Sequence, residues 1–388
     1  MSVTTVRAGL SLWRNVRVQR FLIQAAFVGL LGALGYYLVD RARDLELGFD
    51  FLNGRAGFGI SHQFGTNYDG NDSRLDAYLV GVVNTVRVAA VGIVLATLVG
   101  LVAGVARLSR NWLVSQLATV YVEIVRNTPL LVQIVFWYTA VMLQLPKISD
   151  SISLFDVAFL SNRALALPWA RTADGFGLWL VFLVVAIVAA AGVRLWRRRR
   201  QEQTGQPSYP NWFALGTFVA IALVAFAATG GPLSPERPEL AERGLSYDGG
   251  FQVTPEFAGV LLALVLYTGA FIAEIVRGSI QAVPKGQTEA AAALGLNALQ
   301  RLSLVILPQA MRIMIPPLTS QYLNLTKNSS LAVAIAFPDL VSVGFTLINN
   351  TGQTIPMFVI IMATYLLMSL AISLVMNTLH WRLTLEGR

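Results

Sequence analysis

Long apolar runs with almost no charge recur along the 388-residue chain, and the polar loops between them carry most of its charged residues. About 20 apolar residues cross the hydrocarbon core of a bilayer as one helix, so each run is a candidate membrane span. The pattern therefore predicts an all-α, polytopic membrane protein with about eight transmembrane helices. The predicted spans are 21–39, 79–105, 112–142, 177–195, 212–230, 257–276, about 306–327 and 356–378.

Three apolar segments depart from a simple straight span. The run 112–142 is too long and contains Pro129, which predicts a proline kink or a first half that lies partly in the cytoplasm. Pro316 and Pro317 interrupt the run 306–327. A further apolar piece, 331–343, is short and contains Pro338, so the sequence leaves open whether 331–346 is re-entrant or interfacial.

The N-terminal run predicts an uncleaved signal-anchor helix. Arg7, Arg14, Arg17 and Arg20 precede the apolar run 21–39, and no small-residue cleavage site follows it. A removed signal peptide would carry such a site at the end of its apolar region.

Charge is distributed unequally between the two sets of loops. The loops 1–20, 106–111, 194–205, 277–304 and 380–388 hold sixteen basic and three acidic residues. The loops 40–77, 143–176, 231–256 and 328–355 hold nine basic and sixteen acidic residues. Because basic residues favour the cytoplasmic side, both termini are predicted to be cytoplasmic, with an even number of spans.

The amino-acid composition limits the environment of the chain and the kinds of binding site it can form. The chain is 55% hydrophobic and 13% charged, against about 25% charge in a typical soluble protein. The net charge of +8 then reflects membrane orientation, and we expect the lipid bilayer and no nucleic acid as a partner. There is no cysteine, and the two histidines, His62 and His380, fall in predicted loops, so no bound metal or cofactor is expected.

One cytoplasmic loop has the composition of a docking element. Pro284 can stand near a helix start, and Gly295 can stop the helix. Between them, Ala290–Ala293 favour helix and present small side chains that let a partner approach closely. Glu289 is predicted near the helix start, where a negative charge suits the helix dipole. An ordinary alanine-rich loop helix without a partner is the alternative interpretation.

The spacing of this loop resembles the EAA loop of ATP-binding-cassette (ABC) importer permeases. Glu289-Ala290-Ala291, three residues, Gly295 and nine further residues lead to Val305-Ile306-Leu307-Pro308, with valine where the pattern has isoleucine. The resemblance implies a coupling loop, 284–308, that docks separate ABC ATPase subunits through Lys285, Glu289, Ala290, Ala291 and Gly295. No G-x-x-x-x-G-K-[ST] loop occurs in the chain, so ATP is expected on the partner ATPase and not on this chain.

The flanking sequence resembles the polar amino-acid permease subfamily, which includes histidine, glutamine, arginine and opine types. The similar stretches are 273–295, 306–310, 316–318 and 121–133. Two positions depart from the pattern: Asn127 stands in place of glycine, and Asn328 stands in place of an acid. The long form, with an inserted pair of spans around Arg197-Arg198-Arg199-Arg200, resembles the permeases of broad-specificity general L-amino-acid importers.

The resemblance implies an architecture. A five-helix core of the type I importer (MetI-like) class would carry three added helices, 21–39, 177–195 and 212–230. The domains would be an N-terminal tail, anchor helix and periplasmic loop, a first part of the permease core, an inserted segment with two spans, and a second part of the core with the coupling loop. These correspond to 1–77, 78–144, 145–255 and 256–388.

The resemblance also implies a mechanism and partners. The chain would be a transport subunit, not an enzyme, that passes L-amino acids across the bacterial inner (plasma) membrane by alternating access. A periplasmic amino-acid-binding protein would deliver the substrate, and two ABC ATPase subunits would supply the energy. A second permease subunit, either related or identical, is expected. An ion-coupled secondary carrier is the alternative; it would need no ATPase and no coupling loop, whereas a membrane enzyme would need a convergent catalytic set that is not visible.

Polar residues in the third and seventh spans are candidates for a substrate pathway. A zwitterionic amino acid needs partners for both charges, and polar groups beside broken helices can supply them. We hypothesise that these spans line the pathway, with Lys327 facing the substrate carboxylate; interhelical hydrogen bonding, or a lysine that snorkels to the interface, is the alternative. The candidates are Asn127, Thr128, Gln133, Asn324, Lys327, Asn328 and Ser329.

Two further charged features have structural and functional interpretations. The sequence Glu-Ile-Val-Arg occurs at 123–126 and again at 274–277, and its spacing predicts an ion pair within each helix or a functional charge in the membrane. The cluster Arg197 to Arg200 is interpreted as a topology determinant in contact with lipid headgroups, and a specific partner site is the alternative.

Overall fold

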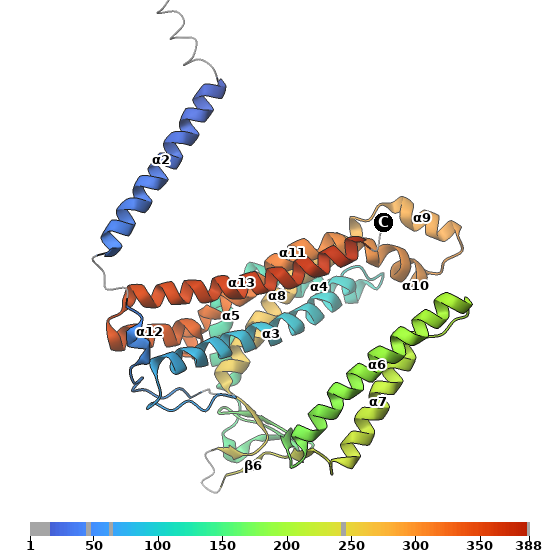
Figure 1. Cartoon of the computed structure of the whole chain (residues 1–388), viewed down its shortest axis with the longest axis horizontal. Coiled ribbons are helices and arrows are strands. Elements are labelled where there is room, and N and C mark those ends of the chain that lie inside the picture. Colours follow the sequence, from blue (N-terminus) through green and yellow to red (C-terminus); the bar gives the residue numbers. More distant parts are fainter. Residues whose placement is uncertain (1–15, 44–47, 62–64, 242–245, 386–388) are drawn as a thin grey trace, which may run out of the picture. The chain divides into compact units, whose positions relative to one another are not determined.

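The computed structural model describes residues 16–43, 48–61, 65–241 and 246–385, and most of these residues are helical (Figure 1). The prediction of an all-α membrane protein is therefore confirmed in its main feature. The sequence features at Arg7, Arg14, His62 and the C-terminal Arg388 lie outside the described residues.

The helices follow one another with short connections. Those before the inserted segment are α2 (Val16–Arg43), η1 (Asp50–Asn53), α3 (Arg74–Ala106), α4 (Trp112–Asn127), α5 (Leu130–Phe136), the π-helix η2 (Trp137–Met142) and η3 (Ile148–Asp150). The inserted pair is α6 (Phe176–Thr204) and α7 (Pro210–Ala228). The remaining helices are α8 (Pro255–Gln281), α9 (Lys285–Ala293), α10 (Ala298–Gln300), the π-helix η4 (Arg301–Ile306), α11 (Leu307–Asn328), η5 (Ser329–Ile335), α12 (Leu340–Thr351) and α13 (Thr354–Leu385).

All eight predicted spans fall in helical segments. Six helical segments of the described chain are long and apolar enough to cross a membrane, and Leu130–Met142 is a shorter apolar helix. The predicted span 21–39 lies within α2, which is not among those six. The six are Arg74–Ala106, Phe176–Thr204, Pro210–Ala228, Pro255–Gln281, Ala298–Ile335 and Thr354–Arg382.

Prolines have opposite effects at two places. The long run 112–142 breaks at Thr128 and Pro129 into α4 and α5, so the predicted proline kink is confirmed. Pro316 and Pro317, predicted to interrupt the seventh span, instead lie inside a continuous α11. Their neighbours Met314 and Ile315 are buried in the core, and this packing offsets the backbone hydrogen bonds that two prolines remove.

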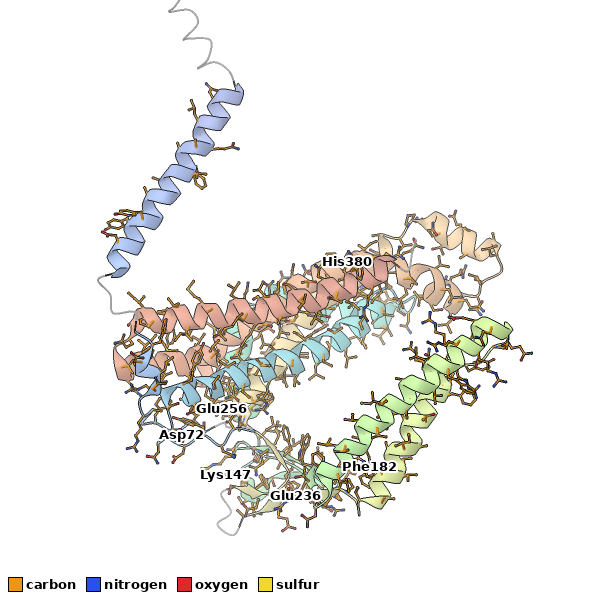
Figure 2. All side chains as sticks on the ribbon, in the orientation of Figure 1. Asp72, Lys147, Phe182, Glu236, Glu256 and His380 are labelled. Carbon is orange, nitrogen blue, oxygen red and sulfur yellow. The ribbon has the colours of Figure 1, made fainter. Side chains whose placement is uncertain are left out.

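His380 was predicted in a loop, and the structure corrects this: it lies within α13 (Figure 2). The apolar pattern ends at about residue 378, but the backbone hydrogen bonds of the helix continue to Leu385. The apolar run ends where the span leaves the lipid. The backbone hydrogen bonds of a helix do not depend on lipid, so the helix can continue beyond that point.

The described chain divides into two compact units. The first comprises 1–83 with 340–370, and the second comprises 84–339 with 371–388. In the first unit, the start of α3 packs against α12 and the first part of α13, and the Tyr78 hydroxyl bonds the Thr364 hydroxyl at 2.7 Å. Its core consists of Ala56, Ile60, Tyr68, Ala77, Tyr78, Val80, Leu340, Val343, Leu347, Met357 and Ile361.

The core of the second unit is built around α8, which packs against α4, α5 and α11. Helix α3 also lies very close to α8, because α3 carries glycine where the two helices touch. A Cβ atom placed on Gly100 would lie 2.4 Å from Cγ2 of Ile272, and one on Gly104 would lie 2.7 Å from the Ala273 carbonyl oxygen. These glycines therefore set the distance between α3 and α8.

The inserted segment contains strands that the sequence did not predict. Strands β1 (Ile152–Leu154), β2 (Ala158–Leu160), β3 (Leu165–Leu167) and β8 (Phe251–Val253) form an antiparallel sheet in the order β1-β2-β3-β8, with Leu165 opposite Val253. Strand β4 (Trp169–Thr172) pairs with β5 (Leu233–Glu236), and β6 (Glu239–Leu240) pairs with β7 (Tyr247–Asp248). Strands of two to four residues are too short to show an alternating pattern.

Helices α6 and α7 form an antiparallel hairpin and lie side by side (Figure 1). The Trp179 indole nitrogen donates to the Ala222 carbonyl at 3.3 Å, and Arg194 Nε donates to Asn211 Oδ1 at 3.0 Å. Ala186, Ala190 and Ala225 are buried between the helices. Small side chains at these positions allow the close packing that drives helix association in lipid.

Candidate coupling loop and substrate pathway

The predicted docking helix is α9, and its two ends follow from the sequence. Pro284 occupies the position before the first helical residue, Lys285. At the other end Gly295 adopts φ +77°, its N–H donates to the Ala292 carbonyl at 2.9 Å, and the Leu296 N–H donates to the Ala291 carbonyl at 3.2 Å. These two bonds form a Schellman cap, which needs a left-handed residue at this point. The prediction that Gly295 ends the helix is confirmed.

One detail of the predicted helix is corrected. Helix α9 has no acidic residue in its first turn, and Glu289 lies in its middle. The helix begins at Lys285, so Glu289 is beyond the first turn, where the dipole effect is concentrated. Glu289 therefore faces the surroundings as an ordinary exposed carboxylate.

The segment after α9 connects it firmly to α11. Asn297 and Gln300 form a reciprocal capping box at the start of α10, with side chain to backbone distances of 2.9 Å in both directions. From Ala298 to Ile335 the chain is then one helical segment, through α10, η4, α11 and η5. A displacement of the coupling loop would thus reach α11 without crossing a flexible linker.

The inner side of the coupling loop is attached to the body of the second unit, and its outer side is open. Val283, just before α9, belongs to the buried core, and Ala291 is 3% exposed. Gln309 of α11 donates from Nε2 to Gln287 Oε1 at 3.3 Å. Lys285, Glu289 and Ala290 are exposed, as is Gly295, and the neighbouring Leu294 is 82% exposed. Of the predicted docking residues, Ala291 therefore supports the helix from within, and the others are accessible.

A cluster of charged residues lies just before the coupling loop along α8. Glu274 forms ion pairs with Arg277 on the same helix, with Arg107 after α3, and with Arg126 of α4, whose Nη1 is 4.0 Å from Glu274 Oε2. Arg107 Nη2 is also 4.0 Å from Glu123 Oε1. The predicted pair within α8 is confirmed, whereas Glu123 pairs with Arg107 in place of Arg126.

Arg107 is the member of this cluster that the sequence did not single out. Its side chain is 10% exposed, and its partners lie 16 and 167 positions further along the chain. No local spacing rule relates residues at such separations. The cluster joins α4 and α8 to the turn after α3, because Glu274 is shared by three arginines and Arg107 pairs with both Glu274 and Glu123.

At the break between α4 and α5, the candidate pathway residues have local partners. Gln133 is buried, and its Nε2 donates to the Val125 carbonyl at 2.8 Å and to the Thr128 carbonyl at 3.0 Å. Thr128 Oγ1 donates to the Ile124 carbonyl at 2.8 Å, and Asn127 Nδ2 donates to the Glu123 carbonyl at 2.7 Å. Gln133 thus satisfies backbone carbonyls freed by the break, while Asn127 stays exposed and Thr128 is half-buried.

The candidates on α11 and η5 divide in a similar way. Ser329 is buried and donates to the Thr326 carbonyl at 2.8 Å, so it serves the helix end. Asn324 and Lys327 are exposed and Asn328 is half-buried. Asn324 and Lys327 continue an exposed stripe along α11, which has the spacing of one helical face. The stripe consists of Ile313, Pro316, Pro317, Ser320, Asn324 and Lys327.

The two sets of candidates lie on elements that pack together. Helix α5 packs against η5, and Leu130 of α5 shares the buried core with Leu325 of α11. No hydrogen bond joins the α4–α5 candidates to those on α11 and η5 within the part of the chain that is described. Of the seven candidates, Asn127, Asn324 and Lys327 are exposed, and Thr128 and Asn328 are half-buried. The other two, Gln133 and Ser329, are buried and donate hydrogen bonds to backbone carbonyls.

A buried acid was missed by the sequence reasoning. Asp339 has no exposed surface and follows Pro338 at the turn between η5 and α12. Ala336, with φ +57°, ends η5, and the Pro338 carbonyl accepts a hydrogen bond from Asn84 Nδ2 at 3.0 Å. A carboxylate inside an apolar segment is a signal for function in a membrane protein, and it could have drawn attention to Asp339.

Comparisons with known proteins agree with this geometry. Residues 96–384 match the family model described as binding-protein-dependent transport system inner membrane component. The chain is 47% identical to the general L-amino acid transport system permease protein AapQ of Rhizobium johnstonii, over 88% of this chain and 84% of that protein. It is 44% identical to the putative amino-acid ABC transporter permease protein YhdX of Escherichia coli, over 99% of both chains.

A third relative is named for four amino acids. The glutamate/glutamine/aspartate/asparagine transport system permease protein BztB of Rhodobacter capsulatus is 36% identical, over 97% of this chain and 95% of that protein. Proteins of this kind are membrane permease subunits, which transport and do not catalyse, and which act together with ATPase and binding-protein components. The match over most of its length shows that the chain belongs to the family of binding-protein-dependent transport system inner membrane components.

Proposed function

We propose that this chain is the permease subunit of a bacterial ABC importer for L-amino acids. The observation that carries the proposal is the coupling loop: α9 starts after Pro284, ends in the Schellman cap at Gly295, is attached from within through Val283 and Ala291, and is exposed on its outer side. A helix of this kind can receive a rigid-body movement from an ATPase and pass it to α8 and α11. The names of the relatives favour amino acids as the substrate.

The proposal includes the finer features of the transporter. Lys285, Glu289, Ala290 and Gly295 would contact the ATPase, with Ala291 holding the helix in place. ATP would bind to the partner ATPase subunits, and this chain would bind no cofactor. A periplasmic amino-acid-binding protein and a second permease subunit would complete the assembly. Both termini would be cytoplasmic, and the segments 1–77 and 145–255 would be additions to a core formed by 78–144 and 256–388.

The test is uptake by the reconstituted transporter. The chain is placed in proteoliposomes with the ATPase, binding protein and second permease of its own transport system, and entry of labelled L-amino acids is measured. We expect uptake only with ATP on the ATPase side and binding protein on the other, and no loss of uptake when ionophores collapse the ion gradients. Uptake that needs an ion gradient and proceeds without ATP would instead establish the ion-coupled carrier.

Substrate breadth is tested on the binding protein. Titration with a panel of L-amino acids should show binding of several side-chain classes, because the long form with the α6–α7 pair resembles broad-specificity systems. Binding of one amino acid alone would show that the long form does not predict breadth.

We propose that Lys327, on the exposed stripe of α11, attracts the substrate carboxylate. A hydrogen bond to a charged group contributes about 1.5–3 kcal/mol, which corresponds to roughly ten- to a hundredfold in affinity. The Lys327→Ala transporter should therefore lose at least about tenfold in uptake rate at low substrate concentration. The control is Lys147→Ala, another exposed lysine, which lies in the inserted segment. Equal uptake by wild type and Lys327→Ala would rule out this role.

A further inference from the structure

The tip of the α6–α7 hairpin, residues 194–213, concentrates positive charge. It holds Arg194 and the run Arg197–Arg200, and its only acidic residue is Glu202. A basic residue that serves only to orient the protein in the membrane needs no specific side-chain contacts, so it can occupy any position in a loop. The contacts of these arginines show that they differ in role.

Two arginines build the tip itself. The guanidinium carbon of Arg197 lies 3.3 Å from the centre of the Phe213 ring, and its Nη1 donates to the Ser208 carbonyl at 3.3 Å. Arg194 Nε donates to Asn211 Oδ1 at 3.0 Å. Together these contacts fasten the end of α6 to the start of α7, so Arg194 and Arg197 are structural.

The other three arginines are exposed and available. Arg198 pairs only with Glu202, at 3.3 Å across one turn, and both side chains are more than 60% exposed. Such a surface pair contributes little and is easily exchanged for an external anion. Arg199 is exposed, and Arg200 is exposed with its guanidinium carbon 5.7 Å from the centre of the Trp196 ring. These side chains offer a group of N–H donors suited to bidentate contacts with phosphate.

A pocket with polar and apolar lining lies beside these arginines at the same tip. Its volume is about 320 Å³, and it is lined by Gln201, Pro207, Ser208, Tyr209, Pro210, Asn211 and Trp212. Tyr209, in the turn between the two helices, is held at φ +45°, a left-handed conformation that is unfavourable for an aromatic residue. The pocket thus provides a cavity for part of a ligand, beside side chains that attract the ligand by charge.

The surroundings of the tip indicate a lipid as its ligand. Almost none of the apolar windows of α6 and α7 is buried within the described chain, so these helices present their sides to lipid. Trp196 and Trp212 are exposed at the ends of the two spans, the position that tryptophan takes at a membrane–water interface. Charged side chains, aromatic side chains and a pocket of mixed lining therefore lie together at the level of the headgroups.

We propose that the α6–α7 tip is a binding site for the headgroups of anionic phospholipids. Arg198, Arg199 and Arg200 contact the phosphate, Trp196 and Trp212 lie among the headgroups, and the pocket between Gln201 and Trp212 receives the polar end of the lipid. The site lies on the side predicted to be cytoplasmic, where anionic lipids give the surface its negative potential. It is independent of the coupling loop and of the substrate.

The test compares two triple variants of the full chain. In the first, Arg198, Arg199 and Arg200 are each replaced by glutamine. In the second, Arg163, Arg171 and Arg237 are replaced, which also removes three exposed arginines and one surface ion pair, Arg171–Glu236, but in the inserted segment far along the chain from the tip. Each protein is incorporated in nanodiscs of phosphatidylcholine alone or of phosphatidylcholine with phosphatidylglycerol, and lipid retained after extraction is identified by native mass spectrometry.

We expect wild type and the second variant to retain phosphatidylglycerol and to gain thermal stability from it. The first variant should bind it about a hundredfold more weakly, since each basic residue near an anionic surface contributes on the order of fivefold in affinity. Inorganic phosphate and a single-stranded oligonucleotide are added in parallel as soluble competitors. Equal retention by both variants, or displacement of the lipid by the oligonucleotide at low concentration, would overturn the proposal.

Discussion

The Gly295→Asp variant should no longer capture the ATPase and should lose ATP-driven uptake, while the permease itself remains folded. Gly295 has φ +77° and closes the Schellman cap of α9. A side chain in this conformation costs roughly 1–2 kcal/mol, which the large core of the second unit can absorb. A Cβ at this position would meet nothing within 4 Å, so the new carboxylate points into the space in which the ATPase is proposed to dock.

The measurement is co-purification of the ATPase with the tagged permease, together with uptake in proteoliposomes. We expect at least about a tenfold loss in both, corresponding to about 1.4 kcal/mol or more of lost docking energy. The matched control is Gly230→Asp: Gly230 closes a Schellman cap after α7 with φ +75°, and a Cβ there also meets nothing within 4 Å. Backbone strain is the same in both variants, so a loss confined to Gly295→Asp locates the contact. If both variants capture the ATPase like wild type, the docking assignment is wrong.

The second large effect is expected at the contact between α3 and α8. The Gly100→Ala variant should be less stable than wild type by about 1–3 kcal/mol, the range for an overfilled core. Its Cβ would lie 2.4 and 2.5 Å from Ile272 and 2.9 Å from the Gly269 carbonyl oxygen. Ile272 is fully buried and β-branched, so it has little freedom to move. The helices must therefore separate, which also disturbs the charged cluster around Glu274.

The same substitution on an open helix face should have the opposite sign. In Gly192→Ala, on α6, the new Cβ meets nothing within 4 Å, and the gain in helix propensity should leave stability unchanged or raised by up to about 1 kcal/mol. Thermal unfolding in detergent, followed by retention of the monodisperse protein, measures both variants. Equal stability of the two alanine variants would show that α3 and α8 are not in the close contact described.

Sequence reasoning succeeded where a property is local. The apolar runs located the helical segments, and Pro129 located the break between α4 and α5. The stop at Gly295 follows from glycine alone, because few other residues accept a left-handed cap. The fixed spacing from Glu289 to Pro308 indicated the family, which the match over 96–384 then showed.

It failed where a residue's environment is formed by distant parts of the chain. Pro316 and Pro317 read as breakers, but packing on the other faces of α11 keeps the helix continuous. Glu123 and Arg126 have the spacing of an intrahelical pair, yet Arg107 competes for Glu123 and Glu274 attracts Arg126. The short strands of the inserted segment form because partners from both of its ends meet, as Leu165 does with Val253.

By itself, the sequence determined that this is a helical membrane protein, where its spans lie, and that it carries a capped coupling helix, because hydrophobic length, helix caps and turn residues act within a few positions along the chain. Only the tertiary structure decided which side of α9 is accessible. It also decided that Gln133 and Ser329 donate to backbone carbonyls while Asn324 and Lys327 stay exposed. Finally, it decided that Glu274 pairs with arginines from three different parts of the chain. These properties depend on which side chains meet after folding. Burial and charge pairing depend on all the residues that surround a side chain in space. Those residues come from no fixed separation along the sequence.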